Sequence, residues 1–193
     1  GRSSAAANGY KRQIVAGNMQ KSGGLPQNCL ATTIMANGGL LKAIEPLGGK
    51  IIWTKVGDRY VVEAMREHDL ALGGEASGHM VLLEYNTTGD ALIAALQVLA
   101  TMVRHDTPLS VLASVYHHMP EAHANVPHDD GAVPSEEELA GLVREAEAGL
   151  KGRGRVVIRP SGTEPIIRVM VQHEVRREAE ALVEALAKRV AAL

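Results

Sequence analysis

Apolar and polar residues alternate along the larger, N-terminal part of the chain in a way that predicts helices separated by short strands. Apolar positions recur at helical spacing over residues 11–20, 37–47, 58–68, 91–104 and 108–116. Short apolar runs between these segments predict strands over residues 28–34, 50–54, 71–73 and 79–84. Strands that alternate with helices are typical of an α/β domain with a mostly parallel mixed sheet.

The C-terminal part of the chain follows a different pattern. A polar segment over residues 117–131 is expected to contain a linker and one strand, and a charged amphipathic helix is expected over 134–150. The remaining segments are two β-branched runs, over 156–158 and 166–170, and a final helix over 175–192. This order predicts a small α+β domain, with an antiparallel sheet and helices on one face.

The change of pattern divides the chain into two predicted domains, residues 10–118 and residues 119–193. Residues 1–9 are small and polar, so we expect them to form a loop or to be disordered. Because the chain does not begin with Met, we also expect it to be a piece of a longer protein.

Composition narrows the classes of protein that fit. Lys and Arg number 20 against 22 Asp and Glu, without a basic stripe interleaved with aromatics, which argues against nucleic-acid binding. The longest apolar stretch, 91–103, contains Gln97 and is too short to cross a bilayer. Cys29, the only cysteine, is expected to be a buried and unreactive thiol. A single cysteine and the lack of a hydrophobic run near Gly1 predict a cytoplasmic protein without a membrane partner.

The most informative stretch is residues 152–171, GRGRVVIRPSGTEPIIRVMV. Its strand–loop–strand pattern brings together two guanidinium groups, two hydroxyls and a glycine that allows close approach of a ligand, from Arg159, Arg168, Ser161, Thr163 and Gly162. Such groups suit a phosphate, which accepts charge-assisted hydrogen bonds from every side.

An ordinary hairpin is the alternative for this stretch, because Ser, Gly and Pro are common in turns and its arginines would then be solvated. Glu164 argues against an anion site, unless it pairs with one of the arginines. Pro165 argues against a helix here, so the backbone would hold an anion as a nest of N–H groups.

Residues 73–79, GGEASGH, form the second informative stretch. In an extended loop, Glu75, Ser77 and His79 would project to one side and present a carboxylate, a hydroxyl and an imidazole, which suit sugar hydroxyls. The alternative is a glycine-rich hairpin with polar surface residues.

Residues 54–61, TKVGDRYV, form the third. Lys55 at a strand end would reach an anion, whereas Asp58 is better explained as a helix cap and Arg59 equally well as a solvated or structural arginine.

A metal site is a further alternative, formed by the histidines and aspartates His117, His118, His123, His128, Asp129 and Asp130. Their spacing matches no tight ligand pattern, so we expect a polar interdomain segment and no metal ligands in this chain.

All three stretches resemble segments of the phosphohexomutase family, in the family's order. R-P-S-G-T-E-P-x-x-R-V-M-V resembles the phosphate-binding loop of the last domain, and looks most like the phosphoglucosamine mutase branch. G-E-x-S-G-H resembles the sugar-binding loop, although Ala76 stands where that branch more often has Gln. T-K-V-G-D-R-Y-V resembles a third-domain segment whose lysine, here Lys55, is expected to face the phosphosugar.

The resemblance implies the third and fourth domains of an enzyme that interconverts glucosamine 6-phosphate and glucosamine 1-phosphate for amino-sugar and peptidoglycan precursor synthesis. It implies that the sugar is bound by Lys55, Glu75, Ser77 and His79. It also implies that the phosphate is bound by Arg159, Ser161, Gly162, Thr163 and Arg168. The family's phosphoserine and its Mg²⁺-binding aspartates belong to the first two domains, and neither segment is found here. We therefore expect this chain alone to be inactive and its partners to be the N-terminal domains. A phosphomannomutase or phosphoglucomutase, or a non-catalytic phosphosugar-binding module, remains the alternative.

Overall fold

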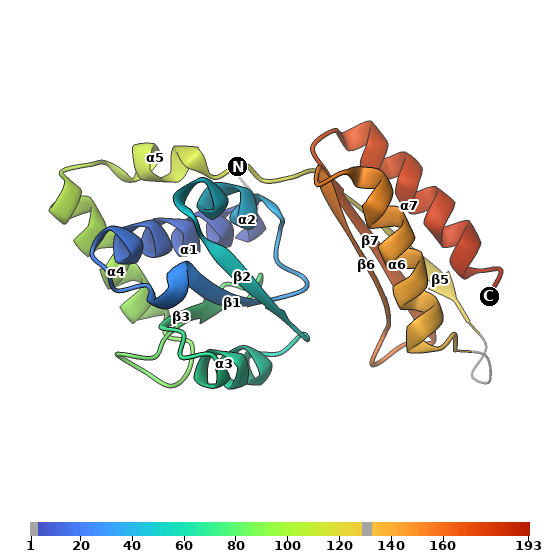
Figure 1. Cartoon of the computed structure of the whole chain (residues 1–193), viewed down its shortest axis with the longest axis horizontal. Coiled ribbons are helices and arrows are strands. Elements are labelled where there is room, and N and C mark those ends of the chain that lie inside the picture. Colours follow the sequence, from blue (N-terminus) through green and yellow to red (C-terminus); the bar gives the residue numbers. More distant parts are fainter. Residues whose placement is uncertain (1–3, 129–132) are drawn as a thin grey trace. The chain divides into compact units, whose positions relative to one another are not determined.

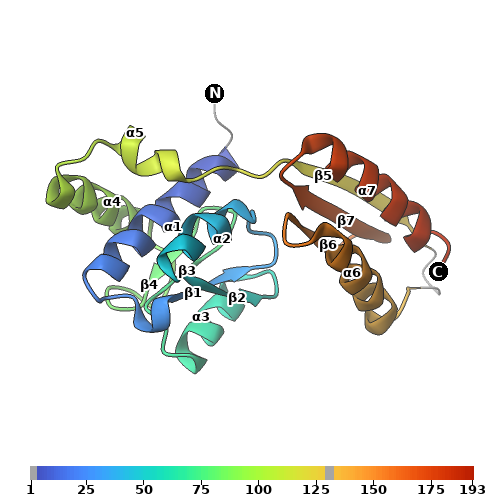
Figure 2. The same cartoon turned by 45° about the horizontal axis from the view of Figure 1, so that its top comes forward.

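A computed structural model describes residues 4–128 and 133–193 of the chain. The chain forms two compact units that meet in sequence between His118 and Met119. Each unit is described by itself below, and Figures 1 and 2 show the elements of both.

The first unit alternates helices with short strands. Its helices are α1 (Ser4–Lys21), α2 (Gly39–Ile44), α3 (Asp58–Glu67), α4 (Ala91–His105) and α5 (Leu109–Leu112), with 3₁₀ turns at Pro26–Asn28, Glu45–Leu47 and Ala113–Val115. Its strands are β1 (Cys29–Thr33), β2 (Lys50–Thr54), β3 (Leu72–Gly74) and β4 (Met80–Leu82).

These four strands form one mixed sheet in the order β2-β1-β3-β4. Strand β1 pairs in parallel with both β2 and β3, and β4 pairs antiparallel with β3. Because the chain moves from β1 to one side and then to the other, the direction of winding reverses between β1 and β3. The predicted α/β domain with a mostly parallel mixed sheet is confirmed.

Helices cover both faces of this sheet. Val61 and Met65 of α3 pack on one face, against Ala31 of β1 and Val81 of β4. Helices α1, α2 and α4 pack on the other face, around Leu30 of β1. All five residues of β1 are buried, which is the pattern of a strand covered on both sides.

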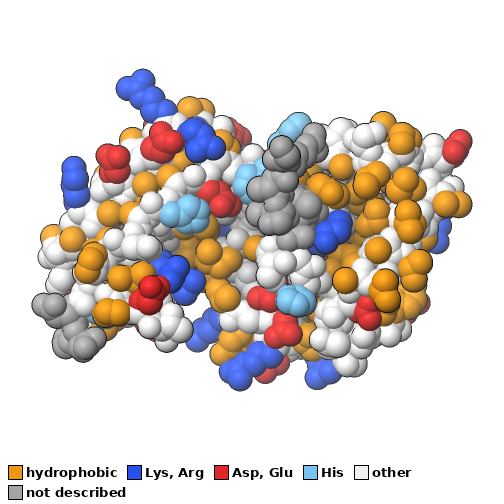
Figure 3. All heavy atoms as spheres, turned by 180° about the vertical axis from the view of Figure 1, so that it is seen from behind, with side chains coloured by type: hydrophobic (Ala, Val, Ile, Leu, Met, Phe, Trp, Pro, Cys, Tyr) orange, Lys and Arg blue, Asp and Glu red, His pale blue; other side chains and the backbone are white. Residues whose placement is uncertain are grey.

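Helix α4 is apolar on its outer face as well. Leu92, Leu96, Leu99 and Val103 are between 53% and 83% exposed and follow one another at helical spacing. Figure 3 shows hydrophobic side chains gathered over this side of the first unit. Monomeric soluble proteins rarely expose a continuous apolar stripe of this kind, so the stripe is not a typical solvent-facing surface.

The second unit consists of strands β5 (Glu121–Pro127), β6 (Gly154–Pro160) and β7 (Ile166–His173) with helices α6 (Glu136–Leu150) and α7 (Arg176–Val190). The strands form an antiparallel sheet in the order β5-β7-β6. Both helices share one core with the sheet, around Val169 of β7, Leu139 of α6 and Leu186 of α7. This agrees with the predicted α+β architecture.

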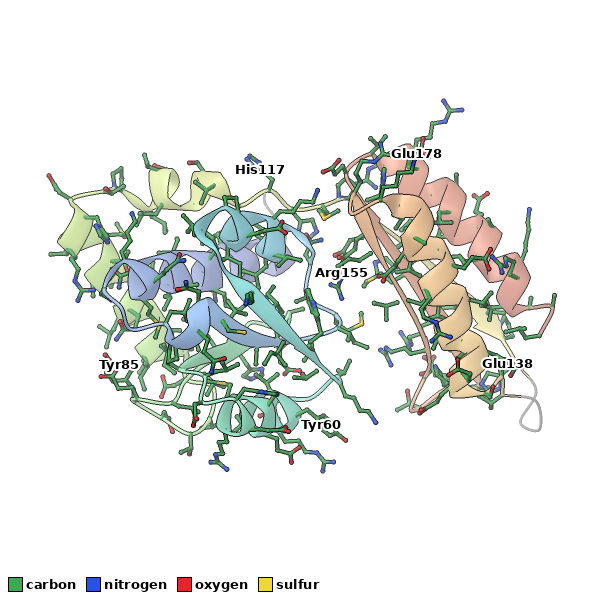
Figure 4. The ribbon with its side chains drawn as sticks, viewed as in Figure 1. Tyr60, Tyr85, His117, Glu138, Arg155 and Glu178 are labelled. Atoms are coloured by element: carbon green, nitrogen blue, oxygen red, sulfur yellow. The ribbon has the colours of Figure 1, made fainter. Side chains whose placement is uncertain are left out.

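Helix α6 begins with a capping box. Ser135 Oγ accepts from the Glu138 N–H at 3.3 Å, and Glu138 Oε2 accepts from the Ser135 N–H at 2.8 Å. Figure 4 shows Glu138 in the first turn of the helix. These bonds satisfy backbone donors that a helix cannot pair internally. The Ser135 hydroxyl also donates to Glu138 Oε2 at 2.7 Å, and this bond, together with the one from the Ser135 N–H, lowers the pKa of Glu138.

Two local predictions were wrong. Residues 1–9 were expected to form a loop or to be disordered, but α1 already begins at Ser4. Alanine has the highest helix propensity, so the run Ala5–Ala7 extends the helix towards the N-terminus. Residues 1–3 lie outside the described residues. Asp58 was expected to cap α3 from outside, but Gly57 takes that position with φ of 131°. Asp58 is the first helical residue, and its carboxylate accepts from the Arg59 N–H at 2.8 Å.

No helix within residues 4–128 and 133–193 has both the length and the apolar character needed to cross a bilayer.

We predict that Cys29 reacts slowly in the folded protein. Its side chain is buried, and burial raises the pKa of the thiol above its usual value of about 8.5. Because the thiolate is the reactive form, a disulfide reagent such as DTNB should label native protein at pH 8 far more slowly than protein unfolded in urea. The raised pKa also means that the stability contributed by the neutral thiol is complete below the unfolded pKa and is lost as pH rises through the folded one. Rapid native labelling would contradict the burial of Cys29.

We predict that Ser135→Ala destabilises the second unit by about 1 kcal/mol, the usual cost of losing an N-cap acceptor. Ser135→Asn is the control, because its side chain can still accept from the helix N-terminus. Urea unfolding monitored by circular dichroism measures the difference. The folded pKa of Glu138 is lowered, so its part of the cap is present above the unfolded pKa and is lost as pH falls through the folded one. Equal midpoints for the two variants would refute the role of the cap.

Candidate functional site

The predicted sugar-binding residues lie at the carboxyl ends of parallel strands in the first unit. Strand β2 ends at Thr54 and leads directly into Lys55, and β3 ends at Gly74 and leads into Glu75. In open α/β sheets, ligands bind beyond the carboxyl ends of strands where the winding reverses, which here is between β1 and β3. The fold therefore puts the second and third informative stretches at the edge where such sites form.

Residues 75–79 form a tight turn, which is the glycine-rich hairpin that the sequence left open beside an extended loop. The Glu75 N–H donates to the His79 carbonyl at 2.9 Å, and the Gly78 N–H donates to the Glu75 carbonyl at 3.2 Å. Gly78 has φ of 110°, in a region that favours glycine. The turn arises because β3 and β4 pair as a hairpin right up to its two ends.

The turn nevertheless brings the three predicted side chains together. Ser77 Oγ lies 3.0 Å from His79 Nδ1 and 3.5 Å from Glu75 Oε2, and His79 Nδ1 lies 3.8 Å from the same carboxylate oxygen. The side chain of Glu75 is 14% exposed and that of His79 is 59% exposed. The cluster thus offers hydrogen-bond acceptors and donors at one place. Its carboxylate is mostly shielded from solvent, and its imidazole is exposed.

The two glycines that end β3 are required by packing. A Cβ atom on Gly73 would lie 2.4 Å from Met65 Sδ, and one on Gly74 would lie 2.4 Å from the His79 carbonyl oxygen. Their role in the GGEASGH stretch is therefore to let α3 and the turn approach the strand.

The Lys55 loop is joined to the sugar turn. Glu75 Oε1 accepts from the Gly57 N–H at 3.1 Å, which connects residues that are far apart in the sequence. Lys55 is exposed. Arg59 stacks over the ring of Tyr60 at 4.5 Å and donates to its hydroxyl at 2.8 Å, so its contacts are those of a structural arginine.

Sequence reasoning missed Arg12, a buried cation beside the same turn. Arg12 Nη1 donates to Thr32 Oγ1 at 2.5 Å and to the Gly74 carbonyl at 3.2 Å. Burial lowers the pKa of Arg12 to about 10, with the charge of Glu75 among the groups that oppose the shift, so the guanidinium stays charged at neutral pH. The signal in the sequence is weak: Arg12 stands between Lys11 and Gln13, and a run of polar residues in a helix is expected to face solvent.

The predicted phosphate-binding residues belong to the β6–β7 hairpin of the second unit. Arg159 and Arg168 are directly paired across the two strands, and Asn125 of β5 is paired with Arg168 on its other side. Paired residues share a face of the sheet, and this is the face opposite to the helices, because the neighbouring Ile158 and Val169 point into the helix-covered core. Asn125 was not predicted, because its register with β7 cannot be read from the sequence.

The connecting loop is ordered by its own backbone. The Ser161 N–H donates to the Ile166 carbonyl at 2.8 Å, the Ile166 N–H donates to the Glu164 carbonyl at 2.8 Å, and the Thr163 N–H lies 3.5 Å from Ser161 Oγ. Glu164 forms an ion pair with Arg168, which satisfies the condition under which it is compatible with an anion site. No helix begins here, as Pro165 predicted.

Nothing within the chain explains the glycine at position 162. Its φ lies outside the left-handed region, and a Cβ atom added there would meet no other atom within 4 Å. The residue borders open space at the tip of the loop.

A pocket of the first unit lies elsewhere. It has a volume of about 390 Å³ and lies among α1, α2, α4 and α5, where Ile14, Leu47 and Val111 contribute to its mainly apolar lining. An apolar pocket without the turn or the Lys55 loop does not suit a phosphosugar, so we place the candidate site at the strand ends.

Among residues 4–128 and 133–193, no group of three or more His, Cys, Asp or Glu side chains could hold a metal ion. The candidate cluster considered in the sequence includes Asp129 and Asp130, which lie outside the described residues.

Comparison with protein families matches both units. The model described as "Phosphoglucomutase/phosphomannomutase, alpha/beta/alpha domain III" matches residues 10–119. The model described as "Phosphoglucomutase/phosphomannomutase, C-terminal domain" matches residues 121–189.

Curated relatives include two phosphoglucosamine mutases. The protein of Geotalea uraniireducens is 48% identical over 163 residues, which cover 82% of this chain and 35% of the relative. The protein of Clostridium botulinum is 43% identical over 180 residues, which cover 92% of this chain and 40% of the relative. The chain therefore spans 35% to 40% of the length of these relatives.

Solved structures share the fold. An N-acetylphosphoglucosamine mutase of Aspergillus fumigatus superposes with a TM-score of 0.75 at 21% identity, covering 96% of this chain and 43% of that one. A second structure of that mutase, in complex with GlcNAc-6P and magnesium, gives a TM-score of 0.66 at 21% identity, covering 98% and 46%. The two family matches and the common fold agree with the resemblance seen in the sequence, and the chain belongs to the phosphoglucomutase/phosphomannomutase family, of which it contains domain III and the C-terminal domain.

Proposed function

We propose that this chain is the C-terminal half of a phosphoglucosamine mutase, a cytoplasmic enzyme that interconverts glucosamine 6-phosphate and glucosamine 1-phosphate. In this proposal the first unit binds sugar hydroxyls and the second binds a phosphate. The choice of sugar is supported by relatives of 43% to 49% identity that are named phosphoglucosamine mutases.

The observation that carries the proposal is the pair of arginines at the β6–β7 hairpin. Like charges directly opposite one another in a sheet repel, so Arg159 and Arg168 would be costly neighbours in a hairpin that served only as a turn. The Glu164 carboxylate neutralises one of them. A dianionic phosphate beside the pair would neutralise the rest and accept charge-assisted hydrogen bonds from both forks.

The loop next to the arginines adds groups of the kind that a phosphate requires. Ser161 and Thr163 offer hydroxyls, and the open space at Gly162 leaves room for an anion close to the backbone. We propose that these five residues hold the phosphate that does not react.

In the first unit, we propose that Glu75, Ser77 and His79 bind sugar hydroxyls, and that Lys55 faces the phosphosugar. Carboxylate, hydroxyl and imidazole groups within hydrogen-bond reach of one another can each exchange a mutual contact for one to a vicinal diol. Binding energy at groups that do not react serves to position the reacting end of the substrate.

The proposed chemistry needs groups from outside this chain. Phosphoryl transfer relies on Mg²⁺ to neutralise charge, and the described residues contain no carboxylate cluster that fits this ion. Because the family resemblance implies that these groups belong to the first two domains, and the relatives are longer than this chain, we assign Mg²⁺ and the phosphoserine to N-terminal domains of a longer protein, which are also the proposed partners of this chain. The exposed apolar stripe on α4 supports such a partner, because it resembles a surface that another domain would cover.

Two alternatives remain. A phosphomannomutase or phosphoglucomutase is favoured by Ala76, which stands where phosphoglucosamine mutases more often have Gln. A non-catalytic phosphosugar-binding module is the other alternative, because binding alone requires only the loops described above.

We predict that the purified chain has no mutase activity but binds phosphosugar. A coupled assay with glucosamine 6-phosphate, Mg²⁺ and glucosamine 1,6-bisphosphate should give turnover only with a full-length relative as positive control. Calorimetric titration of the chain with glucosamine 6-phosphate should give a saturable heat. Turnover by the chain alone would contradict the assignment of the reacting groups to other domains, and no binding at millimolar phosphosugar would contradict the proposed function itself.

We predict that Arg159→Gln weakens phosphate binding about tenfold to a hundredfold, because a charge-assisted hydrogen bond contributes about 1.5–3 kcal/mol. The same change removes one of two facing like charges, so the urea midpoint should stay equal or rise. NMR titration of the chain with inorganic phosphate, at constant ionic strength set with chloride, measures the first effect.

Gly162→Ala is a second arm of this test, since its Cβ would occupy the space proposed for the anion without touching the protein. Gly149→Ala, another position where a Cβ meets nothing within 4 Å, is the matched control. Equal phosphate affinity in Gly162→Ala and Gly149→Ala would argue for an ordinary turn.

A further inference from the structure

A buried guanidinium stands at the point where the winding of the first sheet reverses. Arg12 comes from α1, is 3% exposed, and donates both to Thr32 Oγ1 of β1 and to the carbonyl of Gly74, the last residue of β3. Removing a cation from water is costly unless it is well hydrogen-bonded, and neutral apolar side chains fill most positions of this layer. The Arg12 guanidinium is therefore held at the Gly74 carbonyl at a cost in desolvation free energy.

Two donors converge on that carbonyl. Thr32 Oγ1 donates to it at 2.6 Å while accepting from Arg12, so the three groups form a closed triangle. The carbonyl belongs to the peptide that joins Gly74 to Glu75. When its oxygen is held by two donors, the plane of this peptide is set, and with it the direction in which the Glu75 side chain leaves the strand.

Gly74 is part of the same arrangement. A Cβ atom at this position would lie 3.2 Å from Arg12 Cδ, so the stem of the arginine packs directly against the backbone of the turn. The contact combines hydrogen bonds with close packing, and a lysine cannot reproduce both, because its side chain is one bond shorter and its ammonium would not reach the position of Nη1.

The consequences reach both loops of the proposed sugar site. Glu75 uses one carboxylate oxygen to accept from Gly57 and the other to face Ser77 and His79. A rotation of the Gly74–Glu75 peptide would withdraw the carboxylate from the Gly57 N–H and from the turn at the same time. Lys55 lies two residues before Gly57, so its loop would be released as well.

We propose that Arg12 is a positioning residue for sugar recognition: from α1, it orients the Gly74–Glu75 peptide and thereby joins the Glu75 turn to the Lys55 loop as one prearranged surface. This inference rests on the proposed function for its ligand, but the joining of the two loops is independent of that ligand. Arg12 itself contacts no substrate in this proposal and acts through Glu75.

The test compares Arg12→Met, which keeps an apolar stem and removes the donors, with Arg12→Lys, which keeps the charge. Arg104→Met is the matched control, because Arg104 also contacts α1, through Asn18 at 3.2 Å, but does not contact the turn. Amide hydrogen exchange of Gly57 is the first readout, since its N–H is bonded to Glu75, and the amide of Ala31 in buried β1 reports global opening. Affinity for glucosamine 6-phosphate is the second readout, and affinity for inorganic phosphate is the control for the second unit.

We expect Arg12→Met to accelerate Gly57 exchange about tenfold relative to Ala31 and to weaken glucosamine 6-phosphate binding about tenfold, with Arg12→Lys between it and the unchanged chain. Inorganic phosphate binding and the Arg104→Met variant should stay at the level of the unchanged chain. Equal acceleration at Gly57 and Ala31 would show a purely structural arginine and overturn the proposal. Unchanged Gly57 exchange would overturn it too.

If the unchanged chain fails to bind glucosamine 6-phosphate, the proposed function fails, while the exchange data still decide whether Arg12 joins the two loops.

Discussion

The burial of β1 on both faces is the constraint on which the first unit depends. Every residue of the strand is covered, by α3 on one side and by the layer of α1, α2 and α4 on the other. A strand covered on both faces can pair with other strands only along its two edges, and β2 and β3 occupy these edges as parallel neighbours. The carboxyl ends of the three strands then meet at one edge, so polar residues from distant parts of the sequence are concentrated where the hydrophobic layers end.

The proposed sugar site and the proposed phosphate site differ in how far their polar groups are already paired within the chain. In the first, the Glu75 carboxylate is mostly shielded, and its oxygens are already engaged with Gly57 and Ser77 before any ligand binds. Such prior ordering reduces the entropy lost on binding. In the second, the arginine pair is partly exposed to solvent, and Glu164 pairs with only one of its two like charges. The proposed sugar site thus consists of groups that are already hydrogen-bonded to one another, whereas the proposed phosphate site retains positive charge that is only partly neutralised.

Much of the architecture follows from local patterns that are visible in the sequence. The periodicity of apolar residues placed β2 at its observed bounds and α3, α4, α6 and α7 within about a turn of theirs. The three glycine-containing stretches were identified because glycine, proline and polar residues interrupt those patterns. One error is local too: small residues before Lys11 were interpreted as a loop or as disordered, although alanine favours helix.

Residue types and their spacing were thus sufficient to predict the order of helices and strands, the two sheet classes and the side chains with suitable chemistry, because each depends on neighbours in the chain. Contacts between distant segments depended on the folded structure. The Gly57 N–H on Glu75, the pairing of Asn125 with Arg168 and the convergence of Arg12 and Thr32 on Gly74 all join segments whose distance in space is set by strand register and helix packing. Register and packing minimise the free energy of the whole core, and no local window of sequence contains that information.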